Sequence, residues 1–286
     1  APLPLGSIVS PVLSEMLYNP VGLLEGAGAK LAVKDGMAQP LAGGNIAFTH
    51  CEILDLSVDR FNVGIFPLAE IEADLTLMTS HRRPFASHNL SRPLIMGVVN
   101  VTPDSFSDGG DYAERGEAVS HVFKLIEAGA DIIDIGGEST RPGSKDIDPK
   151  IELQRLKKVL KKFKKKFKKI CLSLDTRKSV IMNEGIQFGV DLINDVSGFN
   201  YDKNSLNFIK KNKVSKVLHH MKGTPNTMQI KPYYKNVLLD VYDYFEKNIK
   251  SKFKDKKIII DPGIGFGKTL KHNLTLISKI SLFHSL

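Results

Sequence analysis

The sequence contains few cysteines and no long apolar run, and each absence argues against a class of protein. Only two cysteines, Cys51 and Cys171, occur in 286 residues, and neither has metal-type partners nearby. This spacing argues against a disulfide framework or a structural zinc site and favours two buried free thiols. No stretch reaches the roughly 18 apolar residues that a membrane span requires.

The start of the chain, APLPLGSIVSPVLSEML, lacks an initiating Met and the basic start of a signal peptide. We therefore expect a processed or shortened N-terminus and a cytoplasmic protein. With 42% hydrophobic and 25% charged residues, the composition is typical of a soluble globular protein. The length suits one large α/β domain or two smaller ones.

A net charge of +9 raises the question of nucleic acid, but the excess is local. Nine lysines fall between residues 157 and 169, and apolar residues recur through the same segment at spacings of 3 and 4. This pattern predicts an amphipathic helix with a lysine-covered outer face. A solvated face is the preferred interpretation, with attraction to anions or nucleic acid as the alternative. The apolar stripe consists of Leu153, Leu156, Leu160, Phe163 and Phe167.

Residues 1–90 differ from the rest of the chain, and we assign them to a small N-terminal extension of unknown role. They are rich in Gly, Ala and Pro, with strands predicted at 46–49 and 62–66. The polar stretch SHRRPFASHNLSRP predicts a linker that ends near Pro93. Residues 91–286 form the second predicted domain.

From residue 94, short apolar runs alternate regularly with segments of helical periodicity. Six such βα units predict an α/β fold with a parallel sheet. The predicted strands are 94–99, 131–135, 170–174, 191–193, 216–218 and 257–260, and the predicted helices are near 114–128, 149–169, 177–188, 203–212, 235–252 and 270–283.

Nearly every predicted strand is followed by a polar residue, and this favours a barrel over a doubly wound sheet. Barrel enzymes build their sites at the carboxyl ends of several strands, whereas a doubly wound sheet gathers ligand groups at one switch point. We therefore predict a (β/α)8 TIM barrel with about six βα units present. The polar residues are Asn100, Glu138, Asp175, Asn194, His219, His220 and Asp261.

Asp175, Asn194 and Asp261 would place two carboxylates and one amide at a single barrel mouth. Carboxylates accept hydrogen bonds, and an amide both donates and accepts. The trio suits a flat heterocycle whose edge alternates donors with acceptors, such as a 2-amino-4-oxo-pteridine. For any single residue of the three, a helix N-cap is the alternative.

Three loops carry further candidates. GVVNVTPDSFSDGGDY (97–112) is rich in hydrogen-bonding groups, and a solvated turn is its alternative. GGESTRPGS (136–144) could hold Arg141 on a stiff turn to clamp a carboxylate or phosphate. DPGIGFGKT (261–269) encloses three residues where a Walker A loop needs four, so its glycines better suit a close approach to a flat ligand.

Six ordered motifs together resemble the loops of the dihydropteroate synthase family, over about residues 92–285. They are MGVVNVTPDSFSDGG, DIIDIGGESTRPG, LSLDTRKS, LINDVSGF, HHMKGTPNTMQ and DPGIGFGK. The resemblance implies a transferase that condenses 7,8-dihydropterin-6-ylmethyl diphosphate with 4-aminobenzoate, giving 7,8-dihydropteroate and pyrophosphate. It also implies sulfonamide sensitivity, homodimers and no membrane or nucleic-acid partner.

The resemblance implies a role for each matching residue. Asp175, Asn194 and Asp261 hold the pterin edge, Asn100 binds Mg²⁺, and residues 102–108 close over the substrates. Thr140, Arg141 and Pro142 border the aminobenzoate, with Arg141 also near the diphosphate. Asp175, Arg141 and Asn100 are the candidate catalytic residues. The other candidate substrate-binding residues are Thr102, Asp104, Ser105, Phe106, Asp134, His219, Met221, Gly265, Phe266 and Lys268.

The sequence departs from the family pattern at two places. The family usually reads Met-His-Met at the end of the fifth strand, and this chain reads His219-His220-Met221. An imidazole that replaces the pterin-packing methionine can still stack. The pattern also stops after six of eight βα units, so we expect a fragment of a longer product or a shortened sequence.

Three other functions stay open at this stage. The same barrel type occurs in methyltetrahydrofolate-dependent methyltransferases, although the loops at 97–112 and 136–144 argue against them. A non-catalytic pterin-binding fragment is a second alternative. A nucleic-acid binder is a third, and it would show salt-sensitive affinity.

Overall fold

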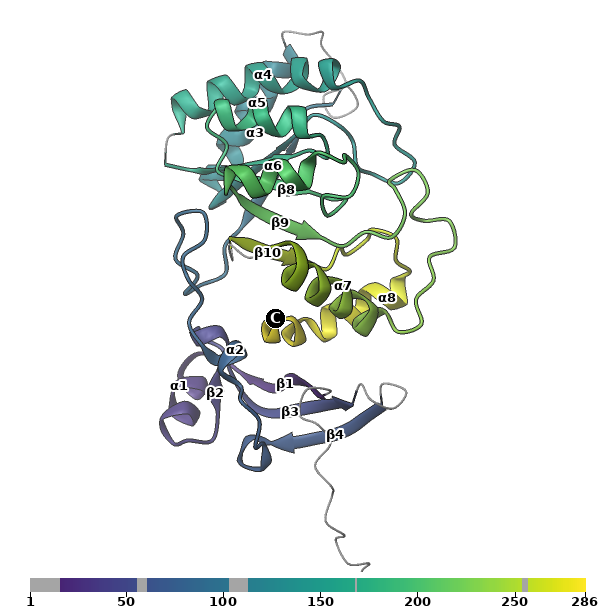
Figure 1. Ribbon diagram of the computed structural model, residues 1–286. Helices are drawn as coiled ribbons and strands as arrows, with labels where there is room; N and C mark the ends of the chain where they lie inside the picture. Colours follow the sequence, from purple (N-terminus) through teal and green to yellow (C-terminus); the bar gives the residue numbers. More distant parts are fainter. Residues whose placement is uncertain (1–15, 56–60, 103–112, 168, 254–256) are drawn as a thin grey trace, which may run out of the picture. The chain divides into compact units, whose positions relative to one another are not determined.

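The computed structural model describes residues 16–55, 61–102, 113–167, 169–253 and 257–286 (Figure 1). The chain divides into two compact units. The N-terminal unit extends to Arg83 and also includes Leu90–Arg92 and Lys279–Leu286. The barrel unit comprises Pro84–Asn89 and Pro93–Ser278. Among the helices of the described residues, none is long and apolar enough to cross a bilayer.

The N-terminal unit is a small antiparallel sheet centred on β3. Strand β3 (Ala47–Asp55) pairs with β1 (Met16–Leu24), β2 (Gln39–Pro40) and β4 (Phe61–Pro67). The predicted strand at 62–66 lies within β4, and residues 47–49 of the one predicted at 46–49 lie in β3, which continues to Asp55. Its other elements are α1 (Gly26–Lys34), η2 (Leu41–Gly43), η3 (Leu68–Glu70), α2 (Thr76–Thr79) and η5 (Ile280–Ser285).

Among the elements of this unit that were not predicted are β1 and α1, and their sequences explain why. Strand β1 carries Pro20 and Gly22 in its middle, residues that ordinarily argue against a strand. Proline is tolerated there because, among the described strands, β1 pairs with β3 alone and forms an edge of the sheet. Helix α1 carries two glycines in its first three residues, and glycine disfavours a helix. Its buried face consists of the small residues Ala29 and Ala32.

The last eight residues of the chain pack within the N-terminal unit. Lys279 and Asn19 both donate hydrogen bonds to the buried carboxylate of Glu52. The Ser281 hydroxyl contacts Oδ1 of Asn19 at 2.9 Å, and Arg82 donates to the carbonyl of His284 at 2.6 Å. The sequence pattern predicted a helix to residue 283, whereas α8 ends at Ser278 and η5 follows.

The described residues of the barrel unit form six parallel strands in strict sequential order, β10-β9-β8-β7-β6-β5. Sequential order has no switch point, so the predicted barrel topology is confirmed over the doubly wound alternative. The strands are β5 (Met96–Asn100), β6 (Ile132–Gly136), β7 (Cys171–Asp175), β8 (Leu192–Asp195), β9 (Ser215–His219) and β10 (Ile258–Asp261). The helices are α3 (Ala113–Glu127), α4 (Pro149–Lys166), α5 (Ser179–Gln187), α6 (Ser205–Asn212), α7 (Val237–Lys252) and α8 (Leu270–Ser278).

Strands β6 and β7 are buried along their whole length, which is typical of parallel strands covered on both faces. Their side chains are apolar except at Asp134 and Ser173, which pair in register within the sheet, and at Asp175, where β7 ends. Burying a polar group costs free energy unless it has a hydrogen-bonding partner. We therefore expect the functional site at the part of the sheet where these polar residues lie.

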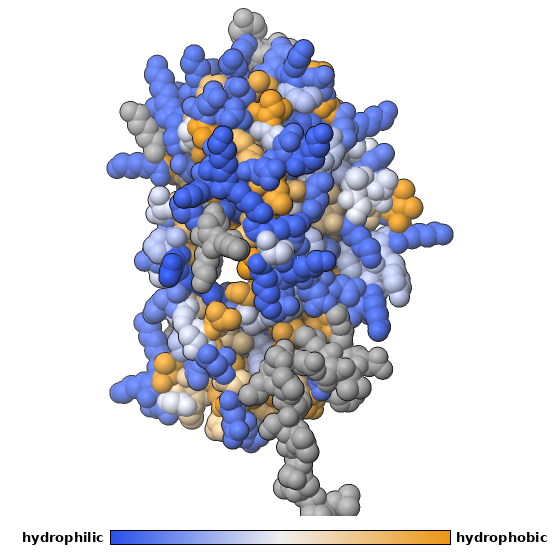
Figure 2. Space-filling view, in the orientation of Figure 1, coloured by the Kyte–Doolittle hydropathy of each residue, from blue (hydrophilic) through white to orange (hydrophobic). Residues whose placement is uncertain are grey.

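Helix α4 is the predicted lysine-covered amphipathic helix. Its core stripe of Leu156, Leu160 and Phe163 is buried, and Val159 joins it. The described lysines from 157 to 169 are exposed except Lys164, which is half-buried and pairs with Asp191 at 3.1 Å. The region of α4 is covered mainly by hydrophilic side chains in Figure 2. The charge excess therefore lies on a solvated helix face.

Cys51 and Cys171 are buried free thiols, as predicted. Burial raises the pKa of Cys51 to about 11 and, with the nearby Asp191, that of Cys171 to about 12. Thiols held protonated in this way are poor nucleophiles and poor metal ligands.

Candidate active site

The polar strand ends form one row across the sheet. Asn100 pairs with Gly136, Gly136 with Asp175, and Asp175 with Asn194 in the parallel registers of β5 to β8. Residues in register on parallel strands project to the same face. The structure therefore brings Asn100, Asp175 and Asn194 to one edge, as predicted. Asp261 pairs with His219 at the same end of β10 and β9.

Gly136 is the point on which two of these side chains converge. A methyl group added there would lie 3.3 Å from Oδ1 of Asn100 and 3.3 Å from Oδ2 of Asp175. The absent side chain thus lets an amide oxygen and a carboxylate oxygen approach one another over the backbone of β6. Two oxygens so placed can bind a cation or two hydrogen-bond donors.

Asp134 and Asn194 are joined by a hydrogen bond that orients the amide. Nδ2 of Asn194 donates to Oδ2 of Asp134 at 2.9 Å. Among the described residues, no partner lies within hydrogen-bonding distance of Oδ1 of Asn194 or Oδ1 of Asp175, and both atoms are buried. Unpartnered buried acceptors are costly, and they are placed to receive the donors of a ligand.

The charges of the two aspartates oppose one another. Burial raises the pKa of Asp134, and burial together with the charge of Asp134 raises that of Asp175 well above its usual value. Close carboxylates in a poorly solvated site resist a second ionisation. A ligand that brings donors or positive charge would relieve this repulsion.

Asp261 has one oxygen engaged by its own loop. Oδ1 accepts a hydrogen bond from the amide of Gly263 at 2.8 Å, and Oδ2 lies 3.9 Å from Nε2 of His219. The edge of the His219 ring meets Phe266, with ring centroids 4.6 Å apart. The carboxylate is 46% exposed, so a ligand can reach it directly.

Lys268 anchors the glycine-rich loop after β10. Its Nζ donates to the carbonyls of Gly263, Phe266 and His220 at 2.9, 3.0 and 3.2 Å, and it lies 3.0 Å from Nδ1 of His220. Burial lowers the pKa of this lysine to about 8 and that of His220 to about 3. The hydrogen bonds from Nζ hold the loop that carries Gly265 and Phe266, and contact of Lys268 with substrate stays a prediction.

The N-cap alternative fails for the predicted pterin trio. Helices α5, α6 and α8 begin at Ser179, Ser205 and Leu270, at least four residues after the corresponding strand ends. The backbone amide of Ser179, at the start of α5, instead donates a hydrogen bond to Oδ2 of Asp202 at 2.8 Å. Asp175, Asn194 and Asp261 are therefore free of a capping role.

The loop with the predicted aminobenzoate residues is fixed by its backbone. The amide of Gly143 donates to the carbonyl of Pro225 at 3.0 Å, and Ser144 closes a turn onto Arg141. Arg141 and Pro142 are exposed and Thr140 is half-buried. Their contact with substrate stays a prediction, as does that of the half-buried Met221.

Part of the predicted substrate cover lies outside the described residues, namely Asp104, Ser105 and Phe106. Thr102 is described and is buried two residues after the end of β5. The amide of Val101, which precedes it, donates to the carbonyl of Gly136 at 2.7 Å. The chain thus leaves β5 next to the glycine on which Asn100 and Asp175 converge.

A buried charge network beneath the site was not predicted from the sequence. Arg177 contacts Glu138 at 2.7 Å and Asp146 at 2.8 Å, while Lys178 contacts Glu138 at 2.8 Å and Glu152 at 2.6 Å. Despite burial, these hydrogen bonds lower the pKa of Glu138 and raise those of both cations. The network ties the loop after β6, the loop after β7 and the first turn of α4 together.

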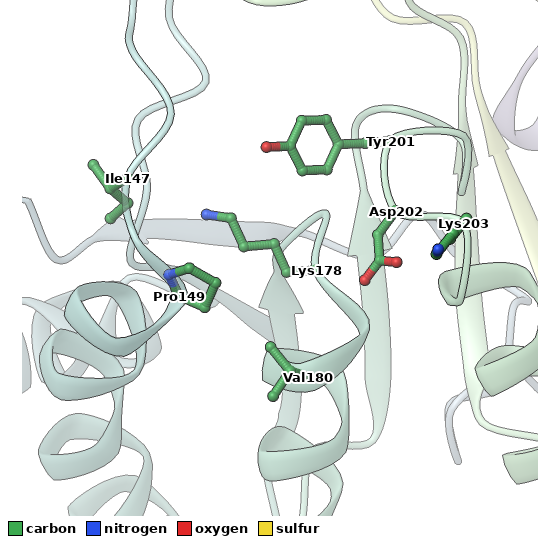
Figure 3. A pocket seen from close by; sticks show the side chains of 7 residues that line it. All are labelled: Ile147, Pro149, Lys178, Val180, Tyr201, Asp202 and Lys203. Carbon is green, nitrogen blue, oxygen red and sulfur yellow. The ribbon is translucent and has the colours of Figure 1, made fainter.

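Next to this network lies an open cavity of about 490 Å³ (Figure 3). Figure 3 shows Tyr201 on one side of it, with Pro149 and Val180 opposite. Tyr201 stacks on the guanidinium of Arg177 at 4.1 Å, and its hydroxyl donates to Asp146 at 2.9 Å. None of the residues that line this cavity belongs to the predicted pterin site.

Comparisons with known proteins match the barrel unit. A family model described as pterin binding enzyme matches residues 96–286. Dihydropteroate synthase of Escherichia coli strain K12 is 40% identical over 202 residues, which are 69% of this chain and 71% of that protein. The chain belongs to the dihydropteroate synthase family. The relative from Bacillus subtilis is 36% identical over 206 residues, 72% of this chain and 71% of that enzyme.

Solved structures of dihydropteroate synthases resemble the fold as well. The Yersinia pestis enzyme, in complex with a sulfonamide drug, is 39% identical and gives a TM-score of 0.64 over 69% of this chain and 72% of that one. The Xanthomonas albilineans enzyme, in complex with 7,8-dihydropteroate, is 34% identical and gives a TM-score of 0.59 over 68% and 69%. The family predicted from the six motifs is confirmed, and the fold is that of the family's TIM barrel.

Proposed function

We propose that this chain acts as a dihydropteroate synthase, which joins 7,8-dihydropterin-6-ylmethyl diphosphate to 4-aminobenzoate and releases pyrophosphate. The observation that carries the proposal is the row of Asn100, Asp175 and Asn194 at the strand ends, with Oδ1 of Asp175 and of Asn194 buried and unpartnered among the described residues. These acceptors suit the N–H donors of a 2-amino-4-oxo-pteridine.

The proposed pterin-binding groups come from β7 and β8 on one side of the site and from β10 and its loop on the other. Asp175 and Asn194 present acceptors from β7 and β8, and Asp261 presents Oδ2 from β10. Phe266 lies beside His219 and supplies an apolar edge for a flat ring. Donors that a ligand brings to Asp175 would lower its raised pKa and favour the carboxylate.

The reaction follows from this charge arrangement. The methylene C–O bond breaks and its electron pair leaves with pyrophosphate, so that positive charge spreads into the pterin ring. The carboxylate of Asp175 stabilises that charge in a buried site, where electrostatic effects are strongest. The neutral aniline nitrogen then forms the C–N bond with its lone pair, and its extra proton passes to solvent.

A divalent cation completes the proposal, with Asn100 as its protein ligand. Magnesium prefers oxygen ligands and often binds through one or two side chains together with substrate phosphates. Oδ1 of Asn100 fits that pattern, because it converges with Oδ2 of Asp175 over Gly136. Among the described residues, no group of three or more His, Cys, Asp or Glu side chains could hold a metal by itself. Bound Mg²⁺ would neutralise the diphosphate as it departs.

Arg141, in the loop after β6, would assist at the same end of the sheet. Its exposed side chain stands on a loop that is anchored at Gly143 and closed by a turn at Ser144. A guanidinium in that position can bind the aminobenzoate carboxylate or the diphosphate in a bidentate manner. The cytoplasmic location and the homodimer stay predictions, and the two free thiols agree with a reducing compartment.

The test is pyrophosphate release with dihydropterin diphosphate, 4-aminobenzoate and Mg²⁺. We expect dihydropteroate and pyrophosphate in equal amounts, inhibition by sulfonamide that excess aminobenzoate relieves, and loss of turnover in Asn100→Ala unless Mg²⁺ is raised. Pterin binding without pyrophosphate release would support a non-catalytic pterin-binding protein instead. Sustained turnover in saturating sulfonamide would contradict the assigned aminobenzoate site.

A further inference from the structure

His219 is the residue of the pterin side at which this chain departs from the family's Met-His-Met pattern. It is the last residue of β9 and pairs in register with Asp261 of β10. Its side chain is 3% exposed, and it lies between the loop after β8 and the glycine-rich loop after β10. A methionine there would supply a thioether, which is only a weak acceptor.

The hydrogen bonds of His219 decide which ring nitrogen carries a proton. Nδ1 lies 2.9 Å from the carbonyl oxygen of Val196. A carbonyl can only accept, so Nδ1 must donate and therefore carries the hydrogen of the neutral ring. Nε2 is left as an acceptor in that tautomer.

Nε2 points toward the open oxygen of Asp261. The separation of 3.9 Å from Oδ2 is too long for a hydrogen bond between them, and with a neutral ring both atoms are acceptors. Oδ1 of Asp261 is already engaged by the amide of Gly263. Nε2 of His219 and Oδ2 of Asp261 are 3.9 Å apart. A single donor nitrogen between them can therefore lie about 2.9 Å from each of these two acceptors.

The surroundings keep the ring neutral and keep it in place. Burial lowers the pKa of His219, the ammonium of Lys268 acts in the same direction, and the carboxylate of Asp261 opposes both. His220, the neighbouring titratable group, is held neutral by its own burial. A side chain at position 263 would begin 3.1 Å from Nε2, so the glycine keeps that nitrogen clear.

We propose that Nε2 of His219 and Oδ2 of Asp261 together receive the two N–H donors of the substrate's 2-amino group, which makes His219 a specificity-determining residue. The inference rests on the proposed function and adds a residue to its recognition of the pterin. The site would therefore select heterocycles that place an exocyclic amine between Nε2 of His219 and Oδ2 of Asp261. An analogue with a carbonyl at that position would place a third acceptor against the pair and bind less well.

The test compares two non-reactive probes, pterin and lumazine, which differ in having an amine or a carbonyl at position 2. Their dissociation constants would be measured by fluorescence titration at neutral pH. We expect the native protein to prefer pterin, and His219→Met to reduce that preference about tenfold, as for one lost hydrogen bond, with no weakening of lumazine binding. His121→Met, at an exposed position on α3, is the matched control and should behave as native.

Two further measurements keep the inference testable if His219→Met folds poorly. His219→Gln retains a donor and an acceptor and should keep part of the preference. In the native protein the pterin preference should fall as the pH drops through the pKa of His219, below its ordinary 6.5, because a proton on Nε2 replaces the acceptor with a donor.

The outcomes separate the inference from the function on which it rests. An unchanged preference in His219→Met, or equal weakening of both probes, would overturn the role of His219 and leave the pterin site intact. Failure of the native protein to bind either probe would count against the proposed function.

Discussion

Asn194 donates a hydrogen bond of 2.9 Å to Oδ2 of Asp134, a residue two strands away in the same sheet. This bond fixes which end of the amide faces Asp134, and it leaves Oδ1 of Asn194 as the acceptor available to a ligand. Asp134 thus orients a recognition group through its carboxylate.

Replacement of Asp134 should therefore weaken pterin binding through Asn194. In Asp134→Leu the amide of Asn194 loses its only described partner for Nδ2 and can rotate. We expect KM for the pterin diphosphate to rise about tenfold, with a smaller effect on kcat. Steady-state kinetics with both substrates varied would measure this, and an unchanged KM would contradict the orienting role.

Asp175→Asn should separate activity from stability. Removing the carboxylate is expected to lower kcat by about 100-fold or more, as for the loss of one preorganised electrostatic group. The same change should stabilise the fold at neutral pH, because it removes a buried charge next to Asp134.

The pH dependence gives the sign of that stabilisation. Asp175 has a folded-state pKa above its unfolded value, so its favourable contribution is present below about pH 4 and is lost as the pH rises through the folded pKa. Urea unfolding of Asp175→Asn should show less loss of stability with rising pH than the native protein. Parallel curves for the two proteins would refute this account.

The buried network should be far more sensitive than a surface ion pair. Arg177→Met leaves Glu138 buried without one of its cationic partners and is expected to cost about 3–5 kcal/mol in unfolding free energy. Lys250→Met removes an exposed pair with Glu246 on α7 and should cost less than about 0.5 kcal/mol. Chemical denaturation of both variants would compare them, and similar losses would show that burial is not the deciding factor.

Two glycines of one loop provide a matched steric test. Gly263 and Gly265 both have positive φ, at 67° and 86°, so alanine at either position carries backbone strain of about 1 kcal/mol. A Cβ at 263 would also come 2.0 Å from the carbonyl oxygen of His220, whereas one at 265 meets nothing within 4 Å. We expect Gly263→Ala to abolish pterin binding and Gly265→Ala to retain it. Equal binding by the two variants would mean that the loop yields without moving Asp261.

Glu52→Gln should loosen the N-terminal unit alone. It weakens the contacts of Glu52 with Lys279 and Asn19, so hydrogen exchange should quicken in β1 and in residues 279–286. Exchange in β6 and β7 should stay as in the native protein. Glu70→Gln, at an exposed position of the same unit, is the control. Uniform acceleration across both units would contradict the prediction.

Sequence patterns predicted the strands of the barrel unit well because each strand can be recognised from a few neighbouring residues. Each strand is a short apolar run that ends in a polar residue, and parallel strands bring such ends to one edge. Asn100, Asp175 and Asn194 could be placed together on that ground alone. The side-chain pairing of Asn194 with Asp134 could not, because it depends on register and on which face of β6 is buried.

The charge network and the N-terminal unit escaped prediction for different physical reasons. Glu138, Glu152, Arg177 and Lys178 are residue types that normally lie in solvent, and only long-range pairing makes their burial tolerable. In the N-terminal unit, Pro20 and Gly22 hide a strand within a loop-like sequence. The partners of Glu52 come from residues 19 and 279, and no local pattern connects them.

The return of residues 279–286 to the N-terminal unit sets an order for biosynthesis. Asn19 and Ser281 are 262 residues apart, and the whole barrel unit is synthesised between them. Strands β1 to β4 leave the ribosome before the barrel unit, yet their contacts with Lys279 and Ser281 can form only after α8 has been made. The barrel unit has a core of its own and can fold during that interval. The N-terminal unit therefore begins to emerge before the barrel unit but completes its packing after it.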